Sequence, residues 1–109
     1  MDIVATRHGG YAGLHEMLTA HGVEHDSPLG LEVNGLLAGC EFFDLPAHLA
    51  DEEVVYDGLH YTLRVVDGPR DHTVAYSDGA IPPDELAAVT AELVAYGHRW
   101  QPVPAPAPA

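Results

Sequence analysis

The stretch "HYTLRVVDGPRDHTVAYS", residues 60–77, decides the fold, because two alternating runs flank a single tight turn. In residues 60–66 and 72–77, apolar or aromatic side chains alternate with polar ones, which is typical of half-buried strands. The segment "DGPR", 67–70, combines glycine with proline as turns do. The stretch therefore predicts an antiparallel hairpin, with these residues facing inward: Tyr61, Leu63, Val65, His72, Val74 and Tyr76.

A second hairpin is predicted at the start of the chain. Residues 2–8, "DIVATRH", alternate and are rich in β-branched side chains, and residues 14–19, "LHEMLT", alternate again. The glycine-rich segment "GGYAG", 9–13, joins the two runs. Two strands connected by a short glycine loop favour an antiparallel pair.

A helix is predicted between the two hairpins. It begins at Pro28, where Asp26 or Ser27 can act as the N-cap, and it is expected to end near Phe43. Its apolar side chains recur at helical spacing, and they are Leu29, Val33, Leu36, Leu37 and Cys40. Each exposed glycine in a helix costs about 1 kcal/mol relative to alanine. Close packing on the sheet is therefore expected for a helix that keeps three of them: Gly30, Gly35 and Gly39.

A second helix is predicted to close the domain. It runs from about Asp84 to Tyr96, and Gly97 follows as its C-cap. Residues 44–58 are expected to form a long acidic connection between the first helix and the hairpin of residues 60–77. The order of elements is therefore strand, strand, helix, strand, strand, helix.

These elements predict an α+β fold in which a four-stranded antiparallel sheet carries two helices on one face. The chain has 109 residues, of which 47% are hydrophobic, so one core and one domain are expected. We assign residues 1–100 to that domain. Residues 101–109, "QPVPAPAPA", alternate proline with alanine and are expected to form a flexible, polyproline-like tail.

The charge of the chain argues against nucleic acid as a partner. Aspartate and glutamate number 17 against 4 basic residues, which gives a net charge of −13. Such a surface repels phosphate backbones, so nucleic acid is not an expected partner. The chain has neither a signal-peptide pattern at its start nor an apolar run of about 20 residues. We expect a cytoplasmic protein that is a monomer when free and does not bind a membrane.

No motif of a catalytic or metal centre is present. His21 and His25 stand four residues apart but lie in a glycine-containing loop, and neither HExxH nor CxxC occurs. Neither serine lies in GxSxG, and Cys40 falls on the apolar stripe of the first helix. The glycine loop lacks the GK[ST] of a phosphate loop. The sequence therefore favours a binding module over an enzyme.

Two loops combine turn residues with apolar side chains and are the candidate binding segments. One is Gly9–Leu14, and the other is "SDGAIPP", residues 77–83. The first could equally be an ordinary hairpin turn, and the second a plain linker from strand to helix. The two loops would be adjacent if the first and fourth predicted strands ran side by side in parallel.

Four segments in order give the chain a resemblance to a known family. They are "TRHGGYAGL", "FFDLP", the stretch "YTLRVVDGPRDHTVAYSDGAIPPDEL", and the closing amphipathic helix. This order resembles the emfourin family, whose members typically show T-R-x-G-G-x-A-G and, after the first helix, F-F-x-L-P. The resemblance covers about residues 3–96. It implies a small bacterial inhibitor of thermolysin-like (M4) zinc metalloproteases, especially the protealysin type.

The resemblance also implies which residues would contact a protease. Small residues would let the backbone approach the cleft, and Tyr11 and Leu14 would offer apolar contacts to substrate subsites. Asp78 would ligate the catalytic zinc of the enzyme, with Asp84 as second choice, and the inhibitor would need no cofactor of its own. The full contact set is Gly9, Gly10, Tyr11, Ala12, Gly13, Leu14, Asp78, Gly79, Ala80 and Ile81.

Two other readings remain open from the sequence. One is a non-inhibitory interaction module that binds a partner through its loops or through an exposed sheet edge. The other is an enzyme, which would require His8 to lie in a cleft beside a carboxylate. Otherwise His8, next to Arg7, is expected to face solvent at a strand end.

Overall fold

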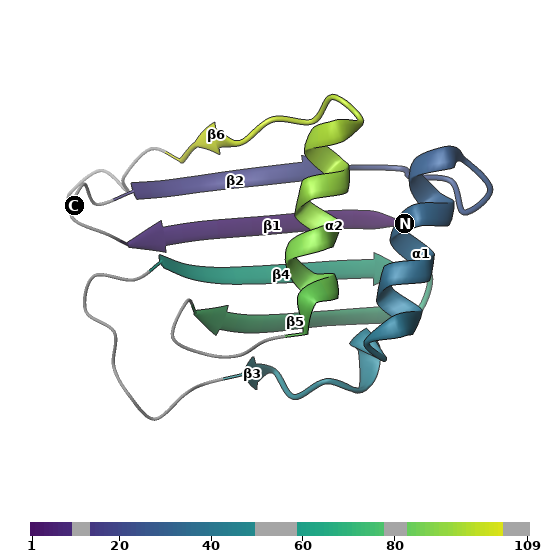
Figure 1. Ribbon diagram of the computed structural model, residues 1–109, viewed down its shortest axis with the longest axis horizontal. Coiled ribbons are helices and arrows are strands. Elements are labelled where there is room, and N and C mark those ends of the chain that lie inside the picture. The colour runs from purple at the N-terminus through teal and green to yellow at the C-terminus, as the bar shows by residue number, and fades with distance from the viewer. Residues whose placement is uncertain (10–13, 50–58, 78–82, 104–109) are drawn as a thin grey trace.

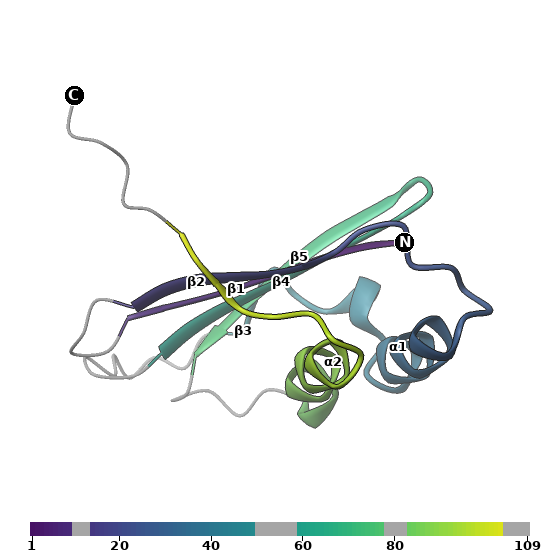
Figure 2. The ribbon, with the colours of Figure 1, turned by 90° about the horizontal axis from the view of Figure 1, so that it is seen from above.

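The described part of the chain folds into one six-stranded sheet with both of its helices packed against the same face, as Figures 1 and 2 show. The computed structural model describes residues 1–9, 14–49, 59–77 and 83–103. The strand order is β3-β5-β4-β1-β2-β6. The strands are β1 (Asp2–Gly9), β2 (Leu14–Ala20), β3 (His48–Leu49), β4 (Leu59–Asp67), β5 (Arg70–Ser77) and β6 (Gln101–Pro102).

The prediction of an α+β fold with two helices is confirmed, but the four-stranded antiparallel sheet is wrong in detail. The two predicted hairpins form the central strands β5, β4, β1 and β2, which are antiparallel throughout. β3 lies in the expected acidic connection and pairs parallel to β5, and β6 lies at the start of the expected tail and pairs with β2. A strand of two residues carries no alternation, so the sequence pattern gives no sign of it.

The first helix, α1, spans Pro28–Gly39 and ends earlier than predicted. The hydroxyl of Ser27 accepts a hydrogen bond from the backbone N–H of Gly30, which settles the choice of N-cap. Beyond the helix, Glu41 takes a left-handed conformation with φ of 52°. This turn breaks the helix, and Phe42–Asp44 form a separate 3-10 turn, η1, instead of a last helical turn.

The second helix, α2, spans Asp84–Ala95, one residue short of the prediction. Gly97 follows with φ of 97°, and the N–H of His98 donates to the carbonyl of Leu93 at 3.0 Å. This is the left-handed helix ending for which glycine is favoured. Neither helix among the described residues is long and apolar enough to cross a membrane.

The core lies between the helices and one face of the sheet, which we call the helix face (Figure 2). No helix of the described residues lies on the opposite face, and we call it the open face. The predicted inward residues Leu63, Val65 and Val74 are fully buried on the helix face. The largest fully buried side chains come from every layer: Phe42, Ile3, Leu18, Leu63, Leu86, Leu93, Val33, Val65, Val74 and Val89.

The three glycines of α1 do not share the expected role of close packing on the sheet. A Cβ on Gly30 would lie 1.9 Å from the backbone oxygen of Glu24, in the segment that precedes the helix. A Cβ on Gly35 would meet nothing within 4 Å, and one on Gly39 would only reach the side chain of Glu85 at 3.7 Å. Only Gly30 is therefore required by close contact, and its contact is with the preceding loop.

Candidate functional site

Both candidate loops depart from strand ends on the same side of the sheet, and we call this side the loop end. It is formed by Gly9 at the end of β1, Leu14 and Leu59 at the starts of β2 and β4, and Ser77 at the end of β5. These residues line up because Gly9 pairs with both Leu14 and Leu59, and Ser77 pairs with His60. β1 and β5 end here, and β2 and β4 begin here, at the left of Figure 1.

The strands from which the two candidate loops depart are not direct neighbours, because β4 lies between β1 and β5. The first and fourth predicted strands, β1 and β5, therefore do not lie side by side, which was the condition for adjacent loops. β1 and β5 are both antiparallel to β4, so they point in the same direction and both loops leave the loop end. Two strand spacings place their starting points about 10 Å apart.

The structure describes only part of the predicted contact set. Gly9 ends β1 with φ of 116°, a conformation that side chains disfavour, and Leu14 begins β2 opposite it. Asp84, the second choice for a zinc ligand, is the exposed first residue of α2. The remaining predicted contact residues lie outside the described residues: Gly10, Tyr11, Ala12, Gly13, Asp78, Gly79, Ala80 and Ile81.

A polar clamp on the helix face supports the loop end, and the sequence analysis missed it. The Nε of Arg7 donates to Oε1 of Glu16 at 2.9 Å, and its Nη2 lies 2.8 Å from the same oxygen. The guanidinium carbon also lies 4.2 Å above the ring centroid of Trp100. Arg7 therefore ties β1 to β2 and to the segment before β6. The sequence offered one signal for this ion pair: the first hairpin places Arg7 directly opposite Glu16.

Two further cross-strand contacts join β1 to β4 and β4 to β5 near the loop end. The hydroxyl groups of Thr6 and Thr62 are hydrogen bonded to each other across β1 and β4. On the helix face the rings of Tyr61 and Tyr76 are stacked, with centroids 5.2 Å apart. Together with the Arg7 clamp, these pairs link the four central strands just behind the loop end.

Three histidines lie side by side across the open face at the loop end, and we call them the histidine row. They are His8, His15 and His60, from β1, β2 and β4. The ring centroids of His8 and His15 are 5.9 Å apart, and those of His8 and His60 are 5.4 Å apart and stacked. Desolvation lowers the pKa of His8, and the imidazoles of His60 and then His15 lower it further.

The expected position of His8 is confirmed, since it is exposed at a strand end. The row itself was missed, because its members are distant in sequence and only the strand register brings them together. Among residues 1–9, 14–49, 59–77 and 83–103, no group of three or more histidine, cysteine, aspartate or glutamate side chains is placed to hold a metal ion.

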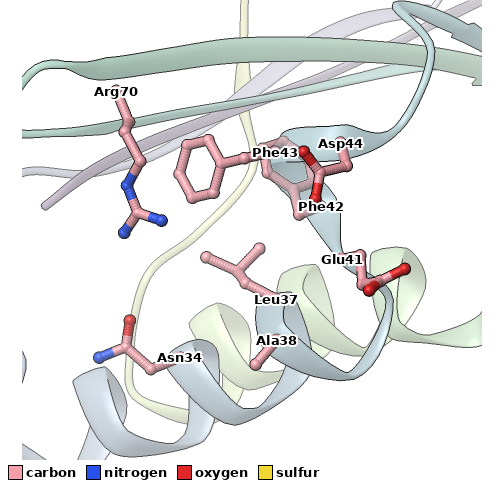
Figure 3. A pocket seen from close by; sticks show the side chains of 8 residues that line it. All are labelled: Asn34, Leu37, Ala38, Glu41, Phe42, Phe43, Asp44 and Arg70. Atoms are coloured by element: carbon pink, nitrogen blue, oxygen red, sulfur yellow. The ribbon is translucent and has the colours of Figure 1, made fainter.

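A pocket of about 360 Å³, whose lining side chains Figure 3 shows, lies at the other end of the sheet, where β5 begins. Arg70, the first residue of β5, places its guanidinium carbon 4.2 Å from the ring centroid of Phe43. The full lining is Asn34, Leu37, Ala38, Glu41, Phe42, Phe43, Asp44 and Arg70. It contains no serine, cysteine or histidine, so it offers none of the usual nucleophile and base pairs.

The "FFDLP" segment, residues 42–46, forms one wall of this pocket and has a packing role. Phe42 is fully buried, with its ring edge-on to that of His72 at 5.5 Å. The carbonyl of Leu45 is 2.7 Å from Nε2 of His72. The segment thus anchors η1 and the approach to β3 along β5, far from the loop end.

The family model of Emfourin matches residues 5–93. The chain belongs to the emfourin family. This membership confirms the resemblance drawn from the four sequence segments. Emfourin is an inhibitor family, which points to a protease-inhibitor role and away from catalysis. No match was found among curated proteins or among solved structures.

In this emfourin domain the two short sequence signatures have different places. "TRHGGYAGL" begins in β1, where Thr6 and Arg7 make the contacts that support the loop end. "FFDLP" lies at the pocket end, where Phe42 fills the core. The matched range includes both candidate loops and stops before β6.

Proposed function

We propose that this emfourin inhibits thermolysin-like zinc metalloproteases of the protealysin type by presenting its loop end to the active-site cleft. The observation that carries the proposal is that both candidate loops leave the sheet at the same end. An inhibitor that occupies a cleft needs several segments to converge on one small surface. A contact of about 800 Å² per partner is within reach of a domain of this size.

In the proposed complex the glycine loop approaches the cleft and the second loop reaches the metal. Tyr11 and Leu14 supply apolar contacts to substrate subsites. A carboxylate oxygen of Asp78 ligates the catalytic zinc of the enzyme at about 2.0–2.2 Å and replaces the water molecule that the zinc otherwise binds. Asp84 is the second choice for this role, although its position in the first turn of α2 also suits a residue that stabilises the helix.

The scaffold supports this mode of binding because it fixes the strand ends that flank the loops already in the free protein. The Arg7–Glu16 ion pair, the contact with Trp100 and the tyrosine stack all lie directly behind the loop end. Holding the loop bases in place reduces the entropy lost on association. It also makes Arg7 a positioning residue rather than a contact residue.

The alternative, a module that binds a partner through a sheet edge, is less well supported. Among the described residues, the outermost strands are β3 and β6, each two residues long and each paired with only two residues of β5 or β2. β6 contains Pro102, which has no backbone N–H to donate. Short edge strands and proline are features that discourage the addition of another strand.

The first test is a titration of the purified protein into thermolysin, with hydrolysis of a peptide substrate as the readout and a serine protease as control. We expect stoichiometric loss of the metalloprotease activity alone. Equal loss of both activities would indicate a nonspecific effect. No loss against thermolysin or against a protealysin-type enzyme would leave the interaction module as the better explanation.

The second test addresses the loops. Tyr11→Ala and Asp78→Ala are each expected to raise the inhibition constant about 30-fold, which corresponds to about 2 kcal/mol. The matched controls are Tyr96→Ala and Asp26→Ala, which remove an exposed tyrosine and an exposed aspartate away from the loop end. If the loop variants and the controls inhibit equally well at matched stability, the assignment of the contact residues is wrong.

A further inference from the structure

The histidine row is placed where the proposed complex would cover it. His8 directly precedes Gly9, and His15 directly follows Leu14, so both are next to the glycine loop. His60 is one residue from the start of β4 and pairs with Ser77, from which the second loop departs. All three side chains are exposed on the open face. An enzyme that holds both loops would therefore lie close to all three imidazoles.

The surroundings of the row contain no described group that would balance a positive charge. The neighbouring positions on the open face are uncharged, and they are Thr6, Met17, Thr62 and Ser77. Arg7 and Glu16 are adjacent in sequence, but strand alternation turns them to the helix face. The nearest described charges on the open face are at the far end of the strands: Asp2, Arg64 and Asp71.

Protonation changes what this surface can do. A neutral imidazole combines an apolar ring with one donor and one acceptor, so a partner can cover it without burying a charge. Protonation in the row brings like charges together, since its centroids are only 5.4 and 5.9 Å apart. Burying those charges beneath an enzyme would add a desolvation cost. The neutral row is therefore the form that suits a complex.

We propose that the histidine row is part of the protease-contacting surface and makes inhibition sensitive to pH, so that the complex forms near neutral pH and weakens on acidification. The inference rests on the proposed function. Its direction follows from linkage, because a complex that requires a neutral group loses affinity once that group binds a proton in the free protein. For one linked proton the inhibition constant rises roughly three- to tenfold between pH 7.5 and 5.5.

The test compares the wild type with the triple variant His8→Gln/His15→Gln/His60→Gln against thermolysin at pH 7.5 and 5.5. Glutamine keeps a polar side chain but does not titrate. The matched control is His21→Gln, an exposed histidine that follows the opposite end of β2. Taking the ratio of inhibition constants at each pH cancels the pH response of the enzyme itself. We expect the wild type and His21→Gln to weaken by at least threefold more than the triple variant.

The outcomes separate this inference from the proposed function. If the wild type inhibits neither thermolysin nor a protealysin-type enzyme at pH 7.5, both fall. If it inhibits at pH 7.5 but shares the pH dependence of the triple variant, only the inference falls. Stronger inhibition at pH 5.5 would also overturn it, because the complex would then favour the protonated form of the row over the neutral form.

A titration by nuclear magnetic resonance tests the row without any enzyme. The imidazole signals of His8 are followed in the wild type and in the variant His15→Gln/His60→Gln. We expect the midpoint of His8 to be lower in the wild type, because its two imidazole neighbours oppose its protonation. An unchanged midpoint would show that the three histidines do not act as a unit, and it would overturn the inference.

Discussion

Gly30 and Gly35 lie in the same helix, yet their replacement by alanine is expected to change stability in opposite directions. A Cβ on Gly30 would lie 1.9 Å from the oxygen and 2.9 Å from the carbon of the Glu24 carbonyl. That oxygen already accepts hydrogen bonds from the backbone N–H and the hydroxyl of Ser27, at 3.1 and 2.6 Å. The carbonyl therefore cannot move away without disturbing the N-cap of α1.

The magnitude follows from these contacts. Inserting an atom into a packed site costs about 1–3 kcal/mol, and weakening a hydrogen bond at the cap adds about 1 kcal/mol. We expect Gly30→Ala to lower the free energy of unfolding by about 2–4 kcal/mol. Gly35 is exposed and unobstructed, so Gly35→Ala should raise it by about 0.5–1 kcal/mol through helix propensity and reduced freedom of the unfolded chain.

Urea unfolding followed by far-ultraviolet circular dichroism measures both changes, and thermal unfolding gives a second estimate. At about 4 °C per kcal/mol, Tm should fall by roughly 8–16 °C for Gly30→Ala and rise by roughly 2–4 °C for Gly35→Ala. A free energy of unfolding of Gly30→Ala within about 0.5 kcal/mol of the wild-type value would refute this reasoning, and so would an equal loss of stability in both variants. Either result would mean that the close contact with Glu24 does not determine which residue position 30 tolerates.

Three further predictions concern the clamp, the core and the acid response. The double-mutant cycle of Arg7→Met and Glu16→Gln should give a coupling energy of about 1 kcal/mol in urea unfolding, whereas a value near zero would mean that the ion pair does not support the loop end. Phe42→Ala should cost about 3–5 kcal/mol, measured in the same way, because the side chain is fully buried; a loss below about 1 kcal/mol would contradict its packing role. Hydrogen bonds from His25 and then Arg70 lower the pKa of Asp67, so its contribution to stability is present above about pH 4 and is lost as the pH falls further. Asp67→Asn should therefore destabilise the protein at pH 6 more than at pH 3, and an equal effect at both would exclude this linkage.

The central part of the fold could be predicted because its signals are local. Alternation over residues 60–66 and 72–77 predicted β4 and β5, and the turn between them placed the strands antiparallel. Pro28 and Ser27 marked the start of α1, and Gly97 marked the end of α2. These features depend on the conformational preferences of a few neighbouring residues, which the sequence displays directly.

The ends of elements and the edges of the sheet were harder to predict. α1 stops at Gly39 because Glu41 adopts a left-handed conformation, which glutamate seldom does and which its sequence context does not signal. β3 and β6 exist because β5 and β2 offer edges to pair with, not because their own two residues prefer a strand. In both cases tertiary contacts override local preference.

The sequence by itself determined the fold class, the two hairpins, the family and the two candidate loops. Only the tertiary structure decided that β4 separates the strands from which those loops depart, although both strands end on the same side of the sheet. It also decided that His8, His15 and His60 form a row there. It also placed Arg7 between Glu16 and Trp100. The physical reason is that strand order and register join residues far apart in the chain, and those pairings depend on burying a shared core rather than on any local pattern.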